Sequence, residues 1–325
     1  MSLLIGTVLL EVGLRVLLGN FGQSKVLQRS DDPDICLELE PSVQLTYTGW
    51  RARTPPTTLR TNSYGIRGPE FAFTKPPGTL RVAIGGDSFT FGQGVEEDEA
   101  FAQVAAGVLS EAGTPTDVLN FGVPGHGTPQ AVALLRKRAL PTRPDLVLVS
   151  VFANDLSPED SYCLYGQGGN AATAFTLRNL YLGRLLYFLA NPVLRPRPEP
   201  DAAERLGSPG QRFQASLREL STLGRERDFL TAVVLLTDRN MFLQSRYCQG
   251  CEAAHDLVPG TGVHVIDMSQ VWTMLQEDIG ANFIPGDDHL SVAGNQLMGA
   301  ALGQALRSWP ALRQRATTLL DSEER

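Results

Sequence analysis

The chain has 325 residues, of which 42% are hydrophobic and 19% are charged, and its formal net charge at pH 7 is −7. This length is sufficient for one large α/β domain with insertions. The mildly acidic balance, together with the lack of a basic stripe or a base-stacking motif, argues against nucleic acid as a partner.

The N-terminal segment from Leu3 to Leu18 is almost wholly apolar and is interrupted only by Glu11 and Arg15. These two side chains stand four residues apart, so they can pair on one helical face. We expect residues 1–19 to form a membrane anchor helix at the cell membrane, with an extracytoplasmic domain following it. An amphipathic helix docked on the domain, or a signal peptide, is the alternative, and the protein would then be cytoplasmic or secreted.

Residues 20–79 are polar and rich in proline, threonine and arginine, and they show little periodicity. This composition predicts a linker followed by irregular structure, with one ordered turn over residues 61–68.

From residue 80 onward, apolar runs alternate with helical patterns. This alternation predicts an α/β domain over residues 80–308, doubly wound and flavodoxin-like, with a mostly parallel five-stranded sheet and helices on both faces. The expected strand order is 2-1-3-4-5. Residues 309–325 are expected to be a C-terminal tail. The predicted strands are 80–85, 116–121, 145–152, 229–236 and 263–268, and the predicted helices are 98–112, 128–139, 209–224 and 291–308.

An insertion of about residues 156–207 interrupts the alternation. It contains a helical pattern over residues 177–189, followed by a proline-rich stretch. Because it leaves the sheet just after the third strand, it could form a lid or an acyl-binding wall over a site there. The alternative is a helix that only packs on the edge of the core.

Polar or glycine-rich motifs directly follow the first three predicted strands. Ser88 lies in a glycine-rich turn after the first strand, Gly125 ends a turn after the second, and Asn154 follows the third. His289 lies in a polar loop near the end of the domain, next to two aspartates. Because open α/β sheets place their chemistry at the carboxyl ends of the strands, these motifs predict a nucleophile, two oxyanion donors and an acid–base pair in one site.

In order and context, these motifs resemble the four sequence blocks of the SGNH (GDSL) hydrolase superfamily. The resemblance covers about residues 80–308. It departs from the family at Phe152, where a glycine is usual, and at Gly286, where many members carry the aspartate of the catalytic triad. The position two residues before the histidine, Asp287, resembles the Asp-x-His form of relatives that act on polysaccharide acyl groups, so we favour Asp287 over Asp288 as the acid.

The resemblance implies the SGNH hydrolase fold and a Ser-His-Asp triad of Ser88, His289 and Asp287. It also implies an oxyanion hole formed by the backbone N–H groups of Ser88 and Gly125 and by the side-chain amide of Asn154. The expected reaction is cleavage of acetyl or short-chain acyl esters of a carbohydrate or lipid through an acyl-Ser88 intermediate, with no metal and no organic cofactor. The alternatives are a membrane-associated O-acyltransferase that acts on a polysaccharide, and a non-catalytic binding or assembly protein on a hydrolase fold.

Cysteines and the remaining histidines give weaker signals. The even number of cysteines permits two disulfides, Cys36–Cys163 and Cys248–Cys251, in an oxidising compartment but does not require them. The second pair, with His255, resembles a metal half-site without a second pair of ligands. His126 is expected either to line the pocket or to lie on a surface loop.

Overall fold

A computed structural model of the chain describes residues 2–18, 26–47, 56–152, 155, 182, 208–236, 254–287 and 289–323. The predicted oxyanion donor Asn154, the alternative acid Asp288 and all of the predicted insertion at 156–207 except Leu182 therefore lie outside the described residues.

The centre of the molecule is a five-stranded sheet in which every pair of neighbouring strands is parallel. Its order is β6-β5-β7-β8-β9, which confirms the predicted order 2-1-3-4-5. Both β5 and β7 are buried along their whole length, as expected for strands covered on both faces. The strands are β5 (Leu80–Gly86), β6 (Thr116–Gly122), β7 (Leu146–Val151), β8 (Leu230–Leu235) and β9 (His264–Asp267).

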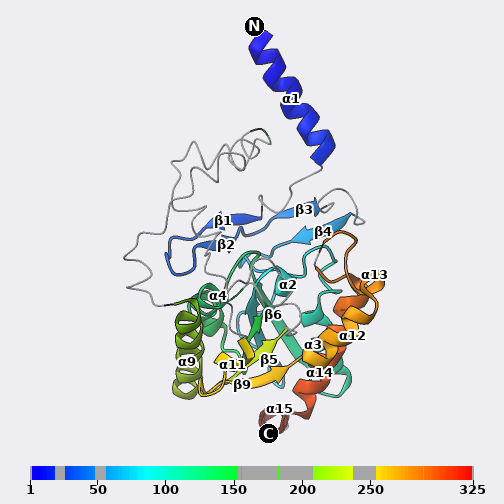
Figure 1. Cartoon of the computed structure of the whole chain (residues 1–325). Coiled ribbons are helices and arrows are strands. Elements are labelled where there is room, and N and C mark those ends of the chain that lie inside the picture. The colour runs from blue at the N-terminus through cyan, green and yellow to red at the C-terminus, as the bar shows by residue number, and fades with distance from the viewer. Residues whose placement is uncertain are drawn as a thin grey trace.

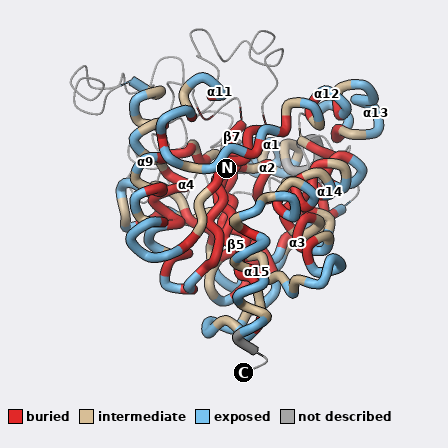
Figure 2. Tube along the Cα trace, turned by 90° about the horizontal axis from the view of Figure 1, so that it is seen from below, coloured by how far each residue is buried: buried red, intermediate tan, exposed pale blue. Residues whose placement is uncertain are grey.

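Helices cover both faces of this sheet (Figures 1 and 2). One face carries α3 (Phe101–Glu111) and α14 (Val292–Ser308), and the other carries α4 (Thr128–Leu134) and α9 (Pro209–Arg227). These helices confirm the four predicted ones, although their ends differ. A π-helical turn, η3 (Leu135–Ala139), and a 3-10 turn, η4 (Leu140–Thr142), continue α4, and the shorter helices are α2 (Ser88–Phe91), α11 (Ala254–Leu257), α12 (Ser269–Glu277) and α13 (Ile279–Asn282).

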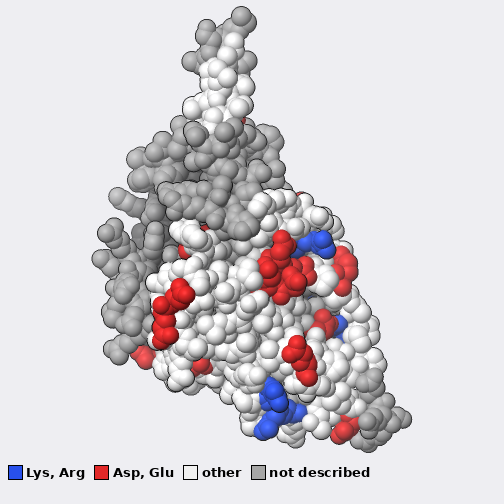
Figure 3. Space-filling view, turned by 90° about the vertical axis from the view of Figure 1, so that its right-hand side faces the viewer, with Lys and Arg blue, Asp and Glu red and all other residues white. Residues whose placement is uncertain are grey.

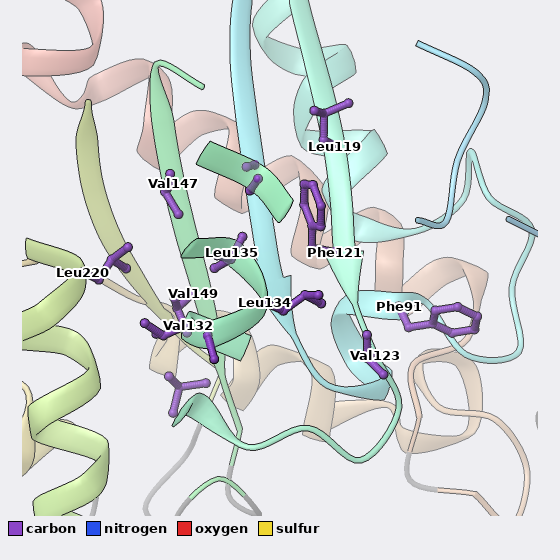
Figure 4. Close-up of a cluster of buried hydrophobic side chains, with 14 of the residues drawn as sticks. Phe91, Leu119, Phe121, Val123, Val132, Leu134, Leu135, Val147, Val149 and Leu220 are labelled. Carbon is purple, nitrogen blue, oxygen red and sulfur yellow. The ribbon is translucent and has the colours of Figure 1, made fainter. Parts of the chain in front are cut away.

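Alternate side chains of the strands enter two separate cores. In β7, Leu146 and Leu148 pack with α3 and α14, whereas Val147 and Val149 pack with α4 and α9 (Figure 4). This period of two is what a strand buried on both faces requires. The two cores hold the carboxyl ends of β5, β6 and β7 side by side at one edge of the domain.

The N-terminal region differs from the predicted linker. It forms two antiparallel pairs, β1 (Leu27–Arg29) with β2 (Leu37–Leu39), and β3 (Gln44–Tyr47) with β4 (Thr57–Arg60). Their buried apolar side chains join the same core as α4 and α9. The prediction of irregular structure is wrong here because strands of three or four residues are too short to show a clear period. We call residues 26–47 and 56–79 the N-terminal module.

The chain end also differs from the prediction. In place of a tail, helix α15 (Pro310–Glu323) packs on the domain through the buried Leu312. Arg315 of this helix donates to Asp145 at 3.4 Å. Asp145 also accepts the backbone N–H of Arg81 at 2.8 Å, so this helix is tied to the amino-terminal edge of the sheet.

Helix α1 (Ser2–Leu18) projects away from the domain (Figure 1). Its apolar side chains Ile5, Val8, Leu9, Leu10 and Val12 are exposed. Among the described helices, however, none combines the length and the apolar character that crossing a bilayer requires. On the face of the molecule in Figure 3, small groups of acidic and basic side chains lie among uncharged ones, some of them side by side, and no continuous basic surface is seen.

Candidate active site

Ser88 lies at the carboxyl end of the central strand β5, as the first residue of the short helix α2. Asp87 caps this helix by accepting the backbone N–H of Phe89 at 2.9 Å. The adjacent side chains of Asp87 and Ser88 therefore point in different directions. Asp87 turns back to the backbone and is buried, whereas Ser88 is partly exposed at the edge of the sheet.

His289 and Asp287 lie on a tight loop that precedes α14. The loop is closed by an antiparallel bridge between Phe283 and Leu290 and by the N–H of Ile284, which donates to the carbonyl of His289 at 2.9 Å. The carboxylate of Asp287 also accepts the backbone N–H of His289 at 3.0 Å. The loop backbone therefore fixes both side chains relative to each other.

The structure brings three of the predicted site residues together, although Ser88 and His289 lie 201 positions apart in the sequence. The Oγ of Ser88 is 2.7 Å from Nε2 of His289, and Nδ1 of His289 is 2.5 Å from Oδ1 of Asp287. With an aspartate on Nδ1, the neutral imidazole carries its proton there, so Nε2 is free to accept the Ser88 hydroxyl. This arrangement can remove a proton from Ser88.

Gly125 lies in the turn that follows β6, next to the carboxyl end of β5. The two strand ends are in register, with Gly122 opposite Gly86. Gly125 has a φ of +86°, which a residue with a side chain rarely adopts. In the described part of the chain, neither the backbone N–H of Gly125 nor that of Ser88 donates to another group. Both therefore remain as candidate oxyanion donors, and the predicted third donor, Asn154, lies outside the described residues.

Asp155 is a buried carboxyl group whose role the sequence did not indicate. Its Oδ2 accepts the N–H of Phe152 at 2.6 Å and its Oδ1 accepts the hydroxyl of Thr128 at 3.1 Å. Burial, and then the nearby charge of Asp87, raise the pKa of Asp155 well above its usual range. The cap residue of α4 is Gly127, and the hydroxyl of Thr128 holds Asp155.

An aromatic cluster packs behind the imidazole of His289. Phe89 lies 5.1 Å from the imidazole, centroid to centroid, and stacks on Phe152 at 4.0 Å. Trp272 contacts the same two phenyl rings and also Phe283. Phe152, which stands where the family usually has glycine, therefore fills part of the core beneath the site. The residue types alone did not show this contact.

His126 does not lie on the surface, and the expectation of a surface loop is wrong. It is 2% exposed, and its Nε2 is 2.8 Å from the carbonyl of Leu37 in β2. Burial lowers the pKa of His126 to about 4, so the ring is neutral at pH 7. His126 therefore joins the turn containing Gly125 to the N-terminal module.

The described residues contain no group of three or more His, Cys, Asp or Glu side chains arranged to hold a metal ion. The predicted half-site at Cys248 and Cys251 lies outside them. Cys36 is disulfide-bonded. The pairing Cys36–Cys163 stays a prediction.

Comparison with known proteins shows which family the chain belongs to. The model of the GDSL-like Lipase/Acylhydrolase family matches residues 85–297, which is more than half of the chain. None of the curated proteins compared with the chain gives a match.

Three solved structures of similar fold illustrate the range of relatives. A psychrotrophic esterase from Pseudoalteromonas sp. is 13% identical, covers 70% of this chain and 97% of its own, and has a TM-score of 0.45. An acetylxylan esterase from Geobacillus stearothermophilus is 13% identical, with 70% and 93% covered and a TM-score of 0.43. A lipase/acylhydrolase from Enterococcus faecalis is 17% identical, with 70% and 95% covered and a TM-score of 0.41. Because these scores are low, the assignment rests on the family model, and by that match the chain belongs to the GDSL-like lipase/acylhydrolase (SGNH) family of ester hydrolases.

Proposed function

We propose that the protein hydrolyses acyl esters through an acyl intermediate on Ser88, with acetyl and other short-chain esters as its substrates. The observation that carries this proposal is the chain of hydrogen bonds from Ser88 Oγ through His289 to Asp287. Membership of an ester hydrolase family supports the ester as the bond that is cleaved.

In the proposed reaction, Nε2 of His289 takes the hydroxyl proton while Ser88 Oγ attacks the ester carbonyl carbon. Asp287 holds the imidazole in the required tautomer and stabilises the imidazolium that forms. When the tetrahedral intermediate collapses, Nε2 returns the proton to the leaving alkoxide, and the acyl group stays on Ser88. Water then attacks the acyl carbon in the same way and releases the carboxylic acid.

The negative oxygen of the tetrahedral intermediate needs hydrogen-bond donors that are already in place. The backbone N–H groups of Ser88 and Gly125 supply two of them in this proposal, since their strand ends are adjacent. The side-chain amide of Asn154 is the proposed third donor, by its position in the sequence after β7.

Hydrolysis of p-nitrophenyl acetate by the full chain tests the proposal. Ser88→Ala and His289→Ala should each nearly abolish turnover, while Ser308→Ala, a control at an exposed serine on α14, should keep it. Adding a soluble sugar acceptor separates hydrolysis from acyl transfer: release of the acyl group to the sugar rather than to water would identify a transferase. Turnover that survives Ser88→Ala would overturn the proposal.

We propose further that the protein associates with the cell membrane through residues 3–18, with the domain outside the cytoplasm. The exposed apolar side chains of α1 support the membrane contact, and the disulfide at Cys36 supports an oxidising compartment. Flotation of the full chain with lipid vesicles, and loss of flotation when residues 1–25 are removed, is the expected result. Equal flotation of both chains would contradict it.

A further inference from the structure

The short helix that carries Ser88 needs outside partners at its carboxyl end. A helix leaves its last four carbonyl groups without partners inside the helix, and α2 has only four residues. The N–H groups of Gly92 and Gln93 satisfy the carbonyl of Ser88, each at 3.1 Å. The side chain of Asn120 in β6 donates to the carbonyl of Thr90 at 2.7 Å.

Arg67 of the N-terminal module supplies the remaining donors. Its Nη1 donates to the carbonyl of Phe91 at 2.5 Å and to that of Gly92, and its Nη2 donates to the carbonyl of Val95 at 2.5 Å. One guanidinium therefore bridges both ends of the loop that follows α2. Its cation also lies 4.8 Å from the centre of the Phe91 ring.

The position of Arg67 is itself fixed from both sides. The side chain is 1% exposed. Its backbone forms a bridge with Asn120, the residue that holds the carbonyl of Thr90. Burial lowers the pKa of Arg67 to about 10, so the guanidinium stays charged at neutral pH. Among the described residues, its hydrogen-bond acceptors are backbone carbonyls, while Glu97, Glu96 and Glu99 act on it through their charge. A buried guanidinium held in this way is costly, which fits a residue retained for a task other than stability.

The loop held by Arg67 contacts both halves of the site. Its first residue, Gly92, has a φ of +76° and accepts Arg67 through its carbonyl. A Cβ at Gly94 would lie 2.4 Å from Ile284, which begins the loop carrying Asp287 and His289. Gln93 donates from Nε2 to the hydroxyl of Tyr47 in β3 at 3.3 Å. A shift of this loop would therefore move Ser88 relative to His289.

We propose that Arg67 is a positioning residue for the nucleophile, which holds Ser88 in place by binding the carbonyl groups of the loop after α2. This inference rests on the proposed function of Ser88. Arg67 lies outside residues 85–297, which match the family model, so the N-terminal module contributes to a site whose other parts belong to the family domain. A misplacement of about 1 Å can lower a rate roughly 10²-fold, so the effect is measurable.

Arg67→Lys is the first variant to test. Lysine keeps the charge and the aliphatic stem, but one ammonium lacks the planar fork that binds the carbonyls of Phe91 and Val95 together. At an assay temperature well below the melting temperature of the variant, we expect kcat for p-nitrophenyl acetate to fall by roughly 10- to 100-fold, with KM nearly unchanged. Amide hydrogen exchange over residues 88–95 should become faster, and this readout does not depend on any activity.

Arg138→Met is the matched control. Arg138 also holds the N-terminal module, through Glu38 at 2.7 Å and the carbonyl of Tyr64, but none of its described contacts is with residues 88–95. This variant should lower the melting temperature while kcat and hydrogen exchange over residues 88–95 stay near their wild-type values.

Gly92→Ala tests the same contact from the loop side, in case a buried arginine is needed for folding. The added Cβ would lie 3.0 Å from Nη1 of Arg67 and 2.7 Å from Cβ of Ala100, so the loop must move. We expect the same fall in kcat and faster exchange.

Wild-type kcat or unchanged exchange in Arg67→Lys overturns the positioning role, and so does an equal loss of kcat in Arg138→Met. Failure of the proposed function gives a different result. Ser88→Ala would then keep turnover, while exchange over residues 88–95 would still report whether Arg67 holds the loop.

Discussion

At the scale of single residues, the geometry around His289 depends on one carboxylate. Asp287 accepts both the backbone N–H and the ring Nδ1–H of His289, so it fixes the loop and the tautomer together. Neither bond requires Asp288. The two adjacent aspartates should therefore differ sharply in their effect on catalysis.

Asp287→Ala should lower kcat/KM by roughly 10³- to 10⁴-fold, because the imidazole loses its orientation and the stabilisation of its charged form. Asp288→Ala should change kcat/KM only a few-fold. Steady-state kinetics with p-nitrophenyl acetate measures both effects. The reverse order would move the acid to Asp288.

His126 makes stability depend on pH. Its pKa in the folded protein is about 4, below the ordinary 6.5, so the unfolded chain binds a proton that the folded chain does not. Stability is therefore complete above about pH 6.5 and falls as the pH drops toward about 4. Between pH 7 and about pH 4.5, the titration of His126 alone should lower the free energy of unfolding by about 2–3 kcal/mol.

His126→Gln should reduce this loss, because glutamine stays neutral in both states and can still donate to the carbonyl of Leu37. Urea unfolding of both proteins at pH 7 and at about pH 4.5 measures the difference. Identical losses in the two proteins would show that His126 does not titrate on unfolding.

At the scale of elements, α3 and α14 pack closely because glycines of α14 face α3. A Cβ at Gly299 would lie 2.5 Å from Cβ of Val104 and 2.6 Å from the carbonyl of Phe101. A Cβ at Gly303 would likewise lie 2.6 Å from Cβ of Val108. These contacts hold α14 close to the sheet, and α14 directly follows the loop that carries His289.

Gly299→Ala should therefore lower the free energy of unfolding by about 1–3 kcal/mol, since the helices must separate. Gly107→Ala, on the exposed face of α3 with open space around it, should raise it by up to about 1 kcal/mol, because alanine favours helix. Thermal unfolding of the two variants compares the effects. A stabilised Gly299→Ala protein would contradict the close packing.

Elements with strong periodic signals were predictable, and short ones were not. The five sheet strands and the long helices follow from alternating apolar runs, and their order follows from the fold class. The strands β1 to β4 have only three or four residues, and the core that their side chains join is completed by α4 and α9. The sequence of the N-terminal module is therefore typical of a linker. Helix α15 was missed because its docking depends on Asp145, far away in the sequence.

The same distinction holds for the site. Ser88, Gly125 and His289 stand in recognisable motifs. Arg67 has no such signal, because its role depends on carbonyl groups of a loop that is about 25 residues away in the chain. The buried position of His126 likewise has no signal in the sequence, since its partner is a backbone carbonyl in β2.

At the scale of the whole molecule, the N-terminal module and the domain that matches the family model share one hydrophobic core. Leu39, Leu59 and Ile66 of the module are buried in the core shared with α4 and α9. The module also binds the loop after Ser88 through Arg67 and the turn at Gly125 through His126. We therefore expect that the domain that matches the family model does not fold into an active protein without the N-terminal module.

Removal of residues 1–25 should leave folding and esterase activity intact, because the module and its contacts remain. A chain that starts at residue 80 should be insoluble or should lose most of its activity, since it exposes the shared core and lacks Arg67. Circular dichroism and kinetics of the two shortened chains give the comparison. Full activity of the chain starting at residue 80 would show that the module is not needed.

The central claim is that His289 activates Ser88 as the nucleophile, and covalent labelling tests it most directly. The full chain is treated with a fluorophosphonate and digested, and the modified peptide is identified by mass spectrometry. We predict one adduct, on Ser88, in the wild-type protein, and a greatly slowed reaction in His289→Ala. An esterase-active wild-type protein that carries no label on Ser88, or equal labelling in His289→Ala, would contradict the account.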